Sequence, residues 1–163
     1  MVARQLGRAP RGIWRVVSSC EHGYPRVIAV GPLLEDGSPF PTTFWLTCPH
    51  LVEAMHTLES AGEHRSWAER AAADPVLASR LRHADDSYRA ARRDEGGGAD
   101  PCAAVGVAGQ SDPLAVKCLH ARVAAALAGT GDPVGEGVLA QLAEHGMPTT
   151  CGDIVCNHAV TSS

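Results

Sequence analysis

The sequence predicts an α+β protein of a single domain (1–163), with a small antiparallel sheet near the N-terminus and a mainly helical remainder. Two observations lead to this prediction. Short runs rich in β-branched and aromatic residues lie within about 12–47, and apolar residues recur at helical spacing over about 48–145. A chain of 163 residues also suits one domain with a real core. The remaining segment, 146–163, is expected to be an irregular tail that contains two cysteines.

Three segments account for the expected sheet. GIWRVVSS (12–19) and PRVIAVGP (25–32) are β-rich runs, and CEHGY between them has the composition of a turn. FPTTFWLT (40–47) is the third expected strand. Pro39 and Pro41 place its beginning at an edge or a bend, because proline has no N–H to donate to a neighbouring strand.

Three consecutive helices are expected after the sheet. Pro49 stands at a plausible first helical position, apolar residues follow at helical spacing, and Gly62 is a natural stop. A second helix is predicted over 63–73. An Asp-Pro pair then begins a third helix, expected over 75–93, whose many charged residues indicate a solvated face.

A long loop and two more helices complete the expected domain. Residues 95–112 are rich in Gly, Ala and Asp, and a loop of this length is either mobile or functional. Its glycines match no phosphate-binding motif. The Asp-Pro pair at 112–113 predicts a helix over 113–128, and the pair at 132–133 predicts a last helix to about residue 145.

Composition and charge exclude several classes of partner. The net charge is −4, the aromatic content is 4%, and no apolar run approaches the ~20 residues that span a bilayer. We therefore expect no nucleic acid and no membrane, and a small-molecule substrate is the partner that fits; the oligomeric state stays open. The basic N-terminus lacks the apolar core of a signal peptide, which favours a cytoplasmic location. Thiols stay reduced there, so six cysteines favour metal binding or catalysis over disulfides.

The cysteines show an unusual association with histidine. Four of the six cysteines are followed by histidine two positions later, in CEH (20–22), CPH (48–50), CLH (118–120) and CNH (156–158). With eight histidines in the chain, random placement would give this spacing for about one cysteine in twenty. On a helix over 113–128, however, Cys118 and His120 would point about 200° apart, so the two would not share one metal ion. His120 is then either a half-buried histidine or a ligand to a different set of residues.

Three cysteines each begin or punctuate an expected element. Cys20 lies in a turn, Cys48 stands where a strand turns into a helix, and Cys118 lies beside small residues. Structural zinc sites usually bring ligands as closely spaced pairs, whereas cysteines so far apart in the sequence are typical of a cluster held inside a domain. The closest approach to a zinc-type pair is Cys151 with Cys156 in the tail, which is half of a tetrahedral site.

The order of these segments resembles the bacterial domain-of-unknown-function family 501. The resemblance rests on Cys20 followed by Gly23, on LEDGSPFPTTFWLTCP at 34–49, on DPLAVKCLHA at 112–121 and on GDPVG at 131–135. It covers most of the chain. It implies an actinobacterial type of protein without an established activity, and its three cysteine-bearing motifs correspond to Cys20, Cys48 and Cys118.

The leading hypothesis is an iron–sulfur protein in which Cys20, Cys48 and Cys118 hold a [4Fe–4S] cluster. Three thiolates leave one iron open as a Lewis acid, which would suit a non-redox lyase or hydrolase: dehydration, hydrolysis or sulfur removal. In the alternative, a zinc ion takes a Cys/His set, with a structural or a hydrolytic role. Further ligand candidates for either metal are His22, His50, His120, Cys151 and Cys156, and the candidates for catalysis are Lys117 and His50.

Two metal-free alternatives remain. Cys48 at a helix N-terminus could act as a nucleophile with a nearby histidine as base. The cysteines could also be core residues of an interaction module, because free cysteine is among the most buried residue types.

Overall fold

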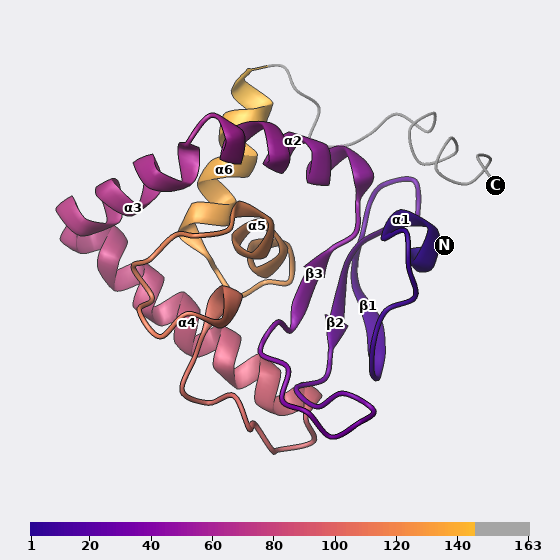
Figure 1. Ribbon diagram of the computed structural model, residues 1–163. Helices are drawn as coiled ribbons and strands as arrows, with labels where there is room; N and C mark the ends of the chain where they lie inside the picture. The colour runs from indigo at the N-terminus through magenta and orange to yellow at the C-terminus, as the bar shows by residue number, and fades with distance from the viewer. Residues whose placement is uncertain (146–163) are drawn as a thin grey trace.

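A computed structural model describes residues 1–145. Those residues form the expected α+β fold, with a three-stranded antiparallel sheet followed by a mainly helical remainder (Figure 1). The strands are β1 (Trp14–Ser19), β2 (Pro25–Val30) and β3 (Phe44–Leu46). The helices are α1 (Val2–Gln5), α2 (Pro49–Ser60), α3 (Glu63–Ala73), α4 (Pro75–Glu95), α5 (Leu119–Leu127) and α6 (Pro133–Glu144), with a 3₁₀ turn η1 (Val107–Gly109). Among the described residues, no helix combines the length and the apolar character that a membrane crossing requires.

The sheet has the order β1-β2-β3, with both neighbouring pairs antiparallel. The turn between β1 and β2 is closed by Cys20, whose N–H donates to the Tyr24 carbonyl at 2.9 Å. β3 is shorter than the predicted strand over 40–47. The N–H of Thr43 donates to the Tyr88 hydroxyl on α4 rather than to a strand, so regular pairing starts at Phe44.

The three helices after the sheet match their sequence signals closely. Pro49 is the first residue of α2, and Gly62, with a left-handed φ of 87°, separates α2 from α3. Asp74 caps α4, since its carboxylate accepts hydrogen bonds from the N–H groups of Val76 and Leu77. The Asp-Pro pair therefore marks the start of α4, because the aspartate caps the helix that begins at the proline.

The predicted helix over 113–128 begins only at Leu119, and this corrects the sequence-based expectation. Asp112 accepts a hydrogen bond from the N–H of Leu114, which makes a turn and not a helical first turn. The buried Arg122 side chain then binds the carbonyls of Pro113 and Ala115, at 2.9 and 3.0 Å. The segment before Cys118 is therefore held in an irregular path, and Cys118 becomes the N-cap of α5 with an extended backbone.

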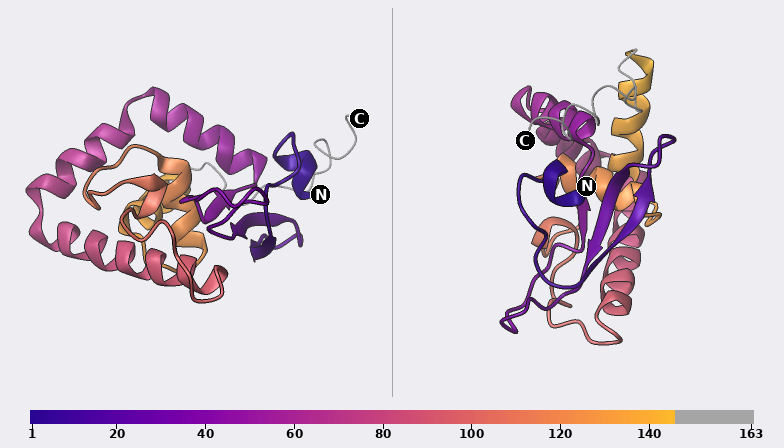
Figure 2. Two further views of the ribbon diagram at one scale, coloured as in Figure 1. Left: turned by 60° about the horizontal axis from the view of Figure 1, so that its bottom comes forward. Right: turned by 90° about the vertical axis from the view of Figure 1, so that its right-hand side faces the viewer.

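Helix α5 lies in the middle of the molecule, between the sheet and α6, and α2, α3 and α4 run around it (Figures 1 and 2). Its residues Val123, Ala124 and Ala125 are fully buried. Gly135 lets α6 approach closely, because a Cβ atom at that position would lie 2.2 Å from the Arg122 carbonyl oxygen. The opposite face of the sheet carries a smaller apolar cluster that includes Val2 of α1. The core thus centres on α5, whose first turn carries the candidate site.

Candidate functional site

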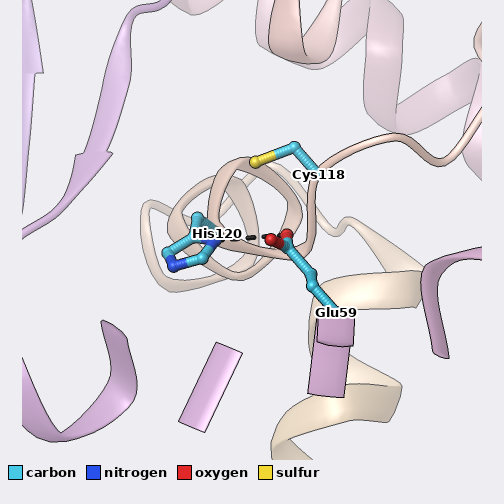
Figure 3. A group of neighbouring side chains, drawn as sticks. All are labelled: Glu59, Cys118 and His120. Atoms are coloured by element: carbon cyan, nitrogen blue, oxygen red, sulfur yellow. Dashed lines mark hydrogen bonds and ion pairs between the residues drawn. The ribbon is translucent and has the colours of Figure 1, made fainter. Parts of the chain in front are cut away.

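One cluster of potential metal ligands occurs among residues 1–145, and it consists of Glu59, Cys118 and His120. One ligand atom from each side chain lies within 4.8 Å of the other two. Figure 3 shows the Glu59 carboxylate reaching from the end of α2 to the first turn of α5, where Cys118 and His120 flank it. Two elements that are about 60 residues apart in the sequence thus deliver a sulfur, a nitrogen and an oxygen donor to one place.

Glu59 is held by the beginning of α5. Its carboxylate accepts hydrogen bonds from the backbone N–H of Leu119 and from Nδ1 of His120, the latter at 3.1 Å. Partial burial raises the pKa of Glu59, but the bonds from Leu119 and His120 outweigh burial and lower the pKa below its usual value. Glu59 is therefore a carboxylate at neutral pH, placed at the positive end of the α5 dipole.

Cys118 is the N-cap residue of α5, with φ −141° and ψ 113°. Its side chain is half-buried against the core. Burial raises the pKa of the Cys118 thiol, and the neighbouring Glu59 carboxylate raises it further. In the metal-free chain the thiol is therefore protonated at neutral pH.

His120 lies on the same side of the helix start as Cys118, contrary to the sequence-based argument that the two point apart. The two side chains would point apart only if both residues had helical backbone, whereas Cys118 is extended and only His120 is helical. The His120 ring also packs on that of His56 from α2, with 4.8 Å between the ring centroids. Its Nε2 atom is buried and has no hydrogen-bond partner within the described part of the chain.

Cys20 and Cys48 lie outside this cluster. Cys20 is half-buried in the β1–β2 turn, and Cys48 is a buried N-cap residue of α2 that packs in the main core. The core also contacts the Cys118 side chain. The convergence of Cys20, Cys48 and Cys118 around one iron–sulfur cluster stays a prediction.

The other sequence candidates are dispersed. His22 lies in the β1–β2 turn, 3.6 Å from the Glu21 carboxylate, and His50 is a half-buried residue in the first turn of α2. Lys117 is exposed beside Cys118. Cys151 and Cys156 lie outside the described residues.

Arg122 lies on α5, four residues after Cys118. The Arg122 guanidinium is buried and donates to Asp132 at 3.0 Å as well as to two carbonyls of the preceding loop. Its charge is used inside the fold, so it does not attract an anion to Cys118.

Glu59 is the site residue that the sequence argument missed. It stands near the end of an amphipathic helix, where a glutamate is ordinary, and only the packing of α2 on α5 brings it to Cys118. One signal was present: His56 and Glu59 are three residues apart on one helix, so they share a face.

The donor set suits zinc and related ions of borderline softness, which bind thiolate, imidazole and carboxylate together. Two ligands at about 2.0–2.1 Å from a tetrahedral ion lie about 3.3 Å apart. The Glu59 oxygen and His120 Nδ1 are 3.1 Å apart, which is close to that value, and an ion bound by both atoms would replace the proton that Nδ1 donates to Glu59. Three protein ligands also leave one tetrahedral position for water or a substrate.

A family profile described as "Protein of unknown function (DUF501)" matches residues 16–140, a range that includes Glu59, Cys118 and His120. No curated protein and no solved structure matches the chain.

Proposed function

The chain belongs to the DUF501 family, and we propose that it binds a zinc-class divalent ion through Glu59, Cys118 and His120. The single observation that supports the proposal is the meeting of three different donor atoms within 4.8 Å, on side chains from two separate elements. The contacts that hold Glu59 place it there before any ion binds.

The proposed site is of the hydrolytic kind. Structural zinc sites close all four positions with protein ligands, whereas catalytic sites keep one open. The three ligands proposed here leave one open, and an ion bound by them would supply Lewis acidity for hydrolysis or elimination. Glu59 would also contribute its negative charge, and the helix start at Leu119 would keep that carboxylate oriented.

The iron–sulfur protein remains the second candidate. In favour of it, Cys48 and Cys118 both begin helices and both contact the same core. A [4Fe–4S] cluster would require Cys20 as its third thiolate and would give a brown protein. A lyase-type reaction is expected only of the iron–sulfur protein, whereas hydrolysis is expected of either the iron–sulfur protein or the zinc-class site.

Titration with Co²⁺ of tag-free protein purified without oxygen tests the proposal. Wild type is expected to bind one Co²⁺ with a thiolate-to-metal charge-transfer band and the intense d–d absorption of a tetrahedral site. Replacement of the sulfur donor (C118A) abolishes the charge-transfer band, and E59Q and H120A each weaken binding about 100-fold or more.

Matched controls separate the candidates. C20A, C48A and a chain truncated after Pro148 should bind Co²⁺ as wild type does. Protein that is brown as purified, with iron that C20A and C48A both remove, would overturn the zinc-class proposal and support the cluster. Protein that binds neither metal would leave the two metal-free alternatives, a Cys48 nucleophile or an interaction module.

A further inference from the structure

A pocket of about 220 Å³ opens directly beside the proposed ligands. Residues 44–46 of β3, together with Thr42, line one side, and Cys118, His120 and Ala121 of the α5 start line the other. The pocket therefore has Cys118 and His120 in its wall, while its remaining lining is apolar except for Thr42. Glu59, the third proposed ligand, is not among the lining residues.

The walls of the pocket are fixed by contacts among the lining residues and with Tyr88 behind them. The indole N–H of Trp45 donates to the Thr42 carbonyl at 3.0 Å, which holds the indole ring in place. Phe44 packs edge-to-face on Tyr88, with 5.5 Å between the ring centroids. Tyr88 in turn bonds the backbone on both sides of Thr42, through Thr43 and Pro41. A pocket with such walls is largely pre-formed, as ligand sites usually are.

The chemistry of the lining selects the kind of molecule. No Lys, Arg, Asp or Glu is among the described residues that line the pocket, so a charged group on the body of a ligand, away from the metal, would find no side chain of opposite charge there. Apolar walls favour a neutral body, and a cavity of about 150 Å³ is known to accept benzene. A volume of 220 Å³ thus accommodates about one six-membered ring with a short linking group.

We infer that the pocket binds a small molecule with a neutral, apolar body of about one ring, whose polar head reaches the open position of the metal. The inference rests on the proposed metal site and names its substrate class. Cys118 and His120 belong both to the ligand set and to the pocket wall, so an ion held by them lies at the pocket. The head is a single metal-binding group such as a carbonyl, a carboxylate or a thiol.

Two hydroxamates with the same head and different bodies test the inference. Benzohydroxamate and acetohydroxamate are titrated into the Co²⁺-loaded full chain, and the shift of the d–d bands reports binding. We expect benzohydroxamate to bind about tenfold more tightly than acetohydroxamate, because the phenyl ring of benzohydroxamate moves from water into the apolar pocket. In A121L, which fills the pocket, the two affinities should fall within about threefold of each other while acetohydroxamate binds as before. W45L, which removes one wall, should also reduce the preference and serves if A121L does not fold.

The outcomes separate this inference from the proposed function. Equal affinities in wild type, or a preference that both A121L and W45L retain, overturn the pocket inference and leave the metal site standing. If the chain binds no Co²⁺, the proposed function fails, and the pocket is tested alone by ¹⁹F line broadening of fluorobenzene. Broadening that A121L reduces supports the apolar pocket, and fluorobenzene lines that stay sharp with wild type overturn it.

Discussion

Replacing Arg122 with methionine should cost a large part of the stability of the fold. The Arg122 side chain is 1% exposed, and its guanidinium makes three hydrogen bonds: one to Asp132 and one each to the carbonyls of Pro113 and Ala115. Methionine retains much of the side-chain volume but leaves the fully buried Asp132 without its cation. Breaking a buried ion pair in this way costs about 3–5 kcal/mol, out of a typical total of about 5–15 kcal/mol.

Urea denaturation followed by circular dichroism measures this cost. With a slope of about 2 kcal/mol/M, R122M should lower the midpoint by about 2 M. Burial already raises the pKa of Asp132 even with Arg122 beside it, and loss of Arg122 raises that pKa further. A carboxyl group whose pKa is raised by folding stabilises the fold below its unfolded-state pKa and loses that contribution as the pH rises. The loss of unfolding free energy in R122M should therefore be smaller at acidic pH.

A matched control uses an exposed arginine. Arg80 pairs with Glu136 at 2.8 Å, but both side chains are more than half exposed, so R80M should cost less than about 1 kcal/mol. The double variant R122M/D132S removes both charges and keeps an oxygen to cap α6, and should recover at least half of the loss. If R122M costs no more than R80M, or if the double variant is no better than R122M, the assigned role of the buried pair is wrong.

Three further predictions concern other parts of the fold. Burial raises the pKa of Asp100, but hydrogen bonds from Arg92 outweigh burial and lower that pKa below its usual value. The stability that this pair contributes should therefore be lost as the pH falls below about 4. In D100N, the free energy of unfolding measured by urea denaturation should lack this part of the decrease at acidic pH. G135A should cost about 1–3 kcal/mol or more, because the new methyl group meets backbone of α5; thermal unfolding measures the loss. Zn²⁺ should protect Cys118 from iodoacetamide while leaving Cys20 reactive, as mass spectrometry of the peptides would reveal; equal protection of both thiols would argue against a site that excludes Cys20.

The parts of the fold that depend on local chemistry could be predicted from the sequence. Asp74 and Asp132 each precede a proline and bond the N–H groups of the following turn, so both helix starts were identified correctly. Asp112 has the same local sequence, yet its helix starts seven residues later, at Leu119. The difference is tertiary, because the side chain of Arg122 binds carbonyls that a helix would otherwise use.

Tertiary contacts also explain why the sequence indicated only part of the candidate site. Residue type and spacing indicated Cys118 and His120 as candidate ligands. A helix assumed over both residues placed their side chains on opposite sides, which favoured Cys20 and Cys48 as the partners of Cys118. The extended backbone of Cys118 reverses that geometry. Glu59 could not be identified without the packing of α2 on α5, because its contact with Leu119 joins residues 60 positions apart.

X-ray absorption at the zinc edge, on full-length tag-free protein loaded with one equivalent of Zn²⁺, tests the proposed ligand set most directly. The proposal predicts one sulfur scatterer at about 2.3 Å and two or three nitrogen or oxygen scatterers at about 2.0–2.1 Å, with the sulfur absent in C118A. A first shell with two or more sulfur atoms, or a sulfur signal that survives in C118A, would contradict a site formed by Glu59, Cys118 and His120.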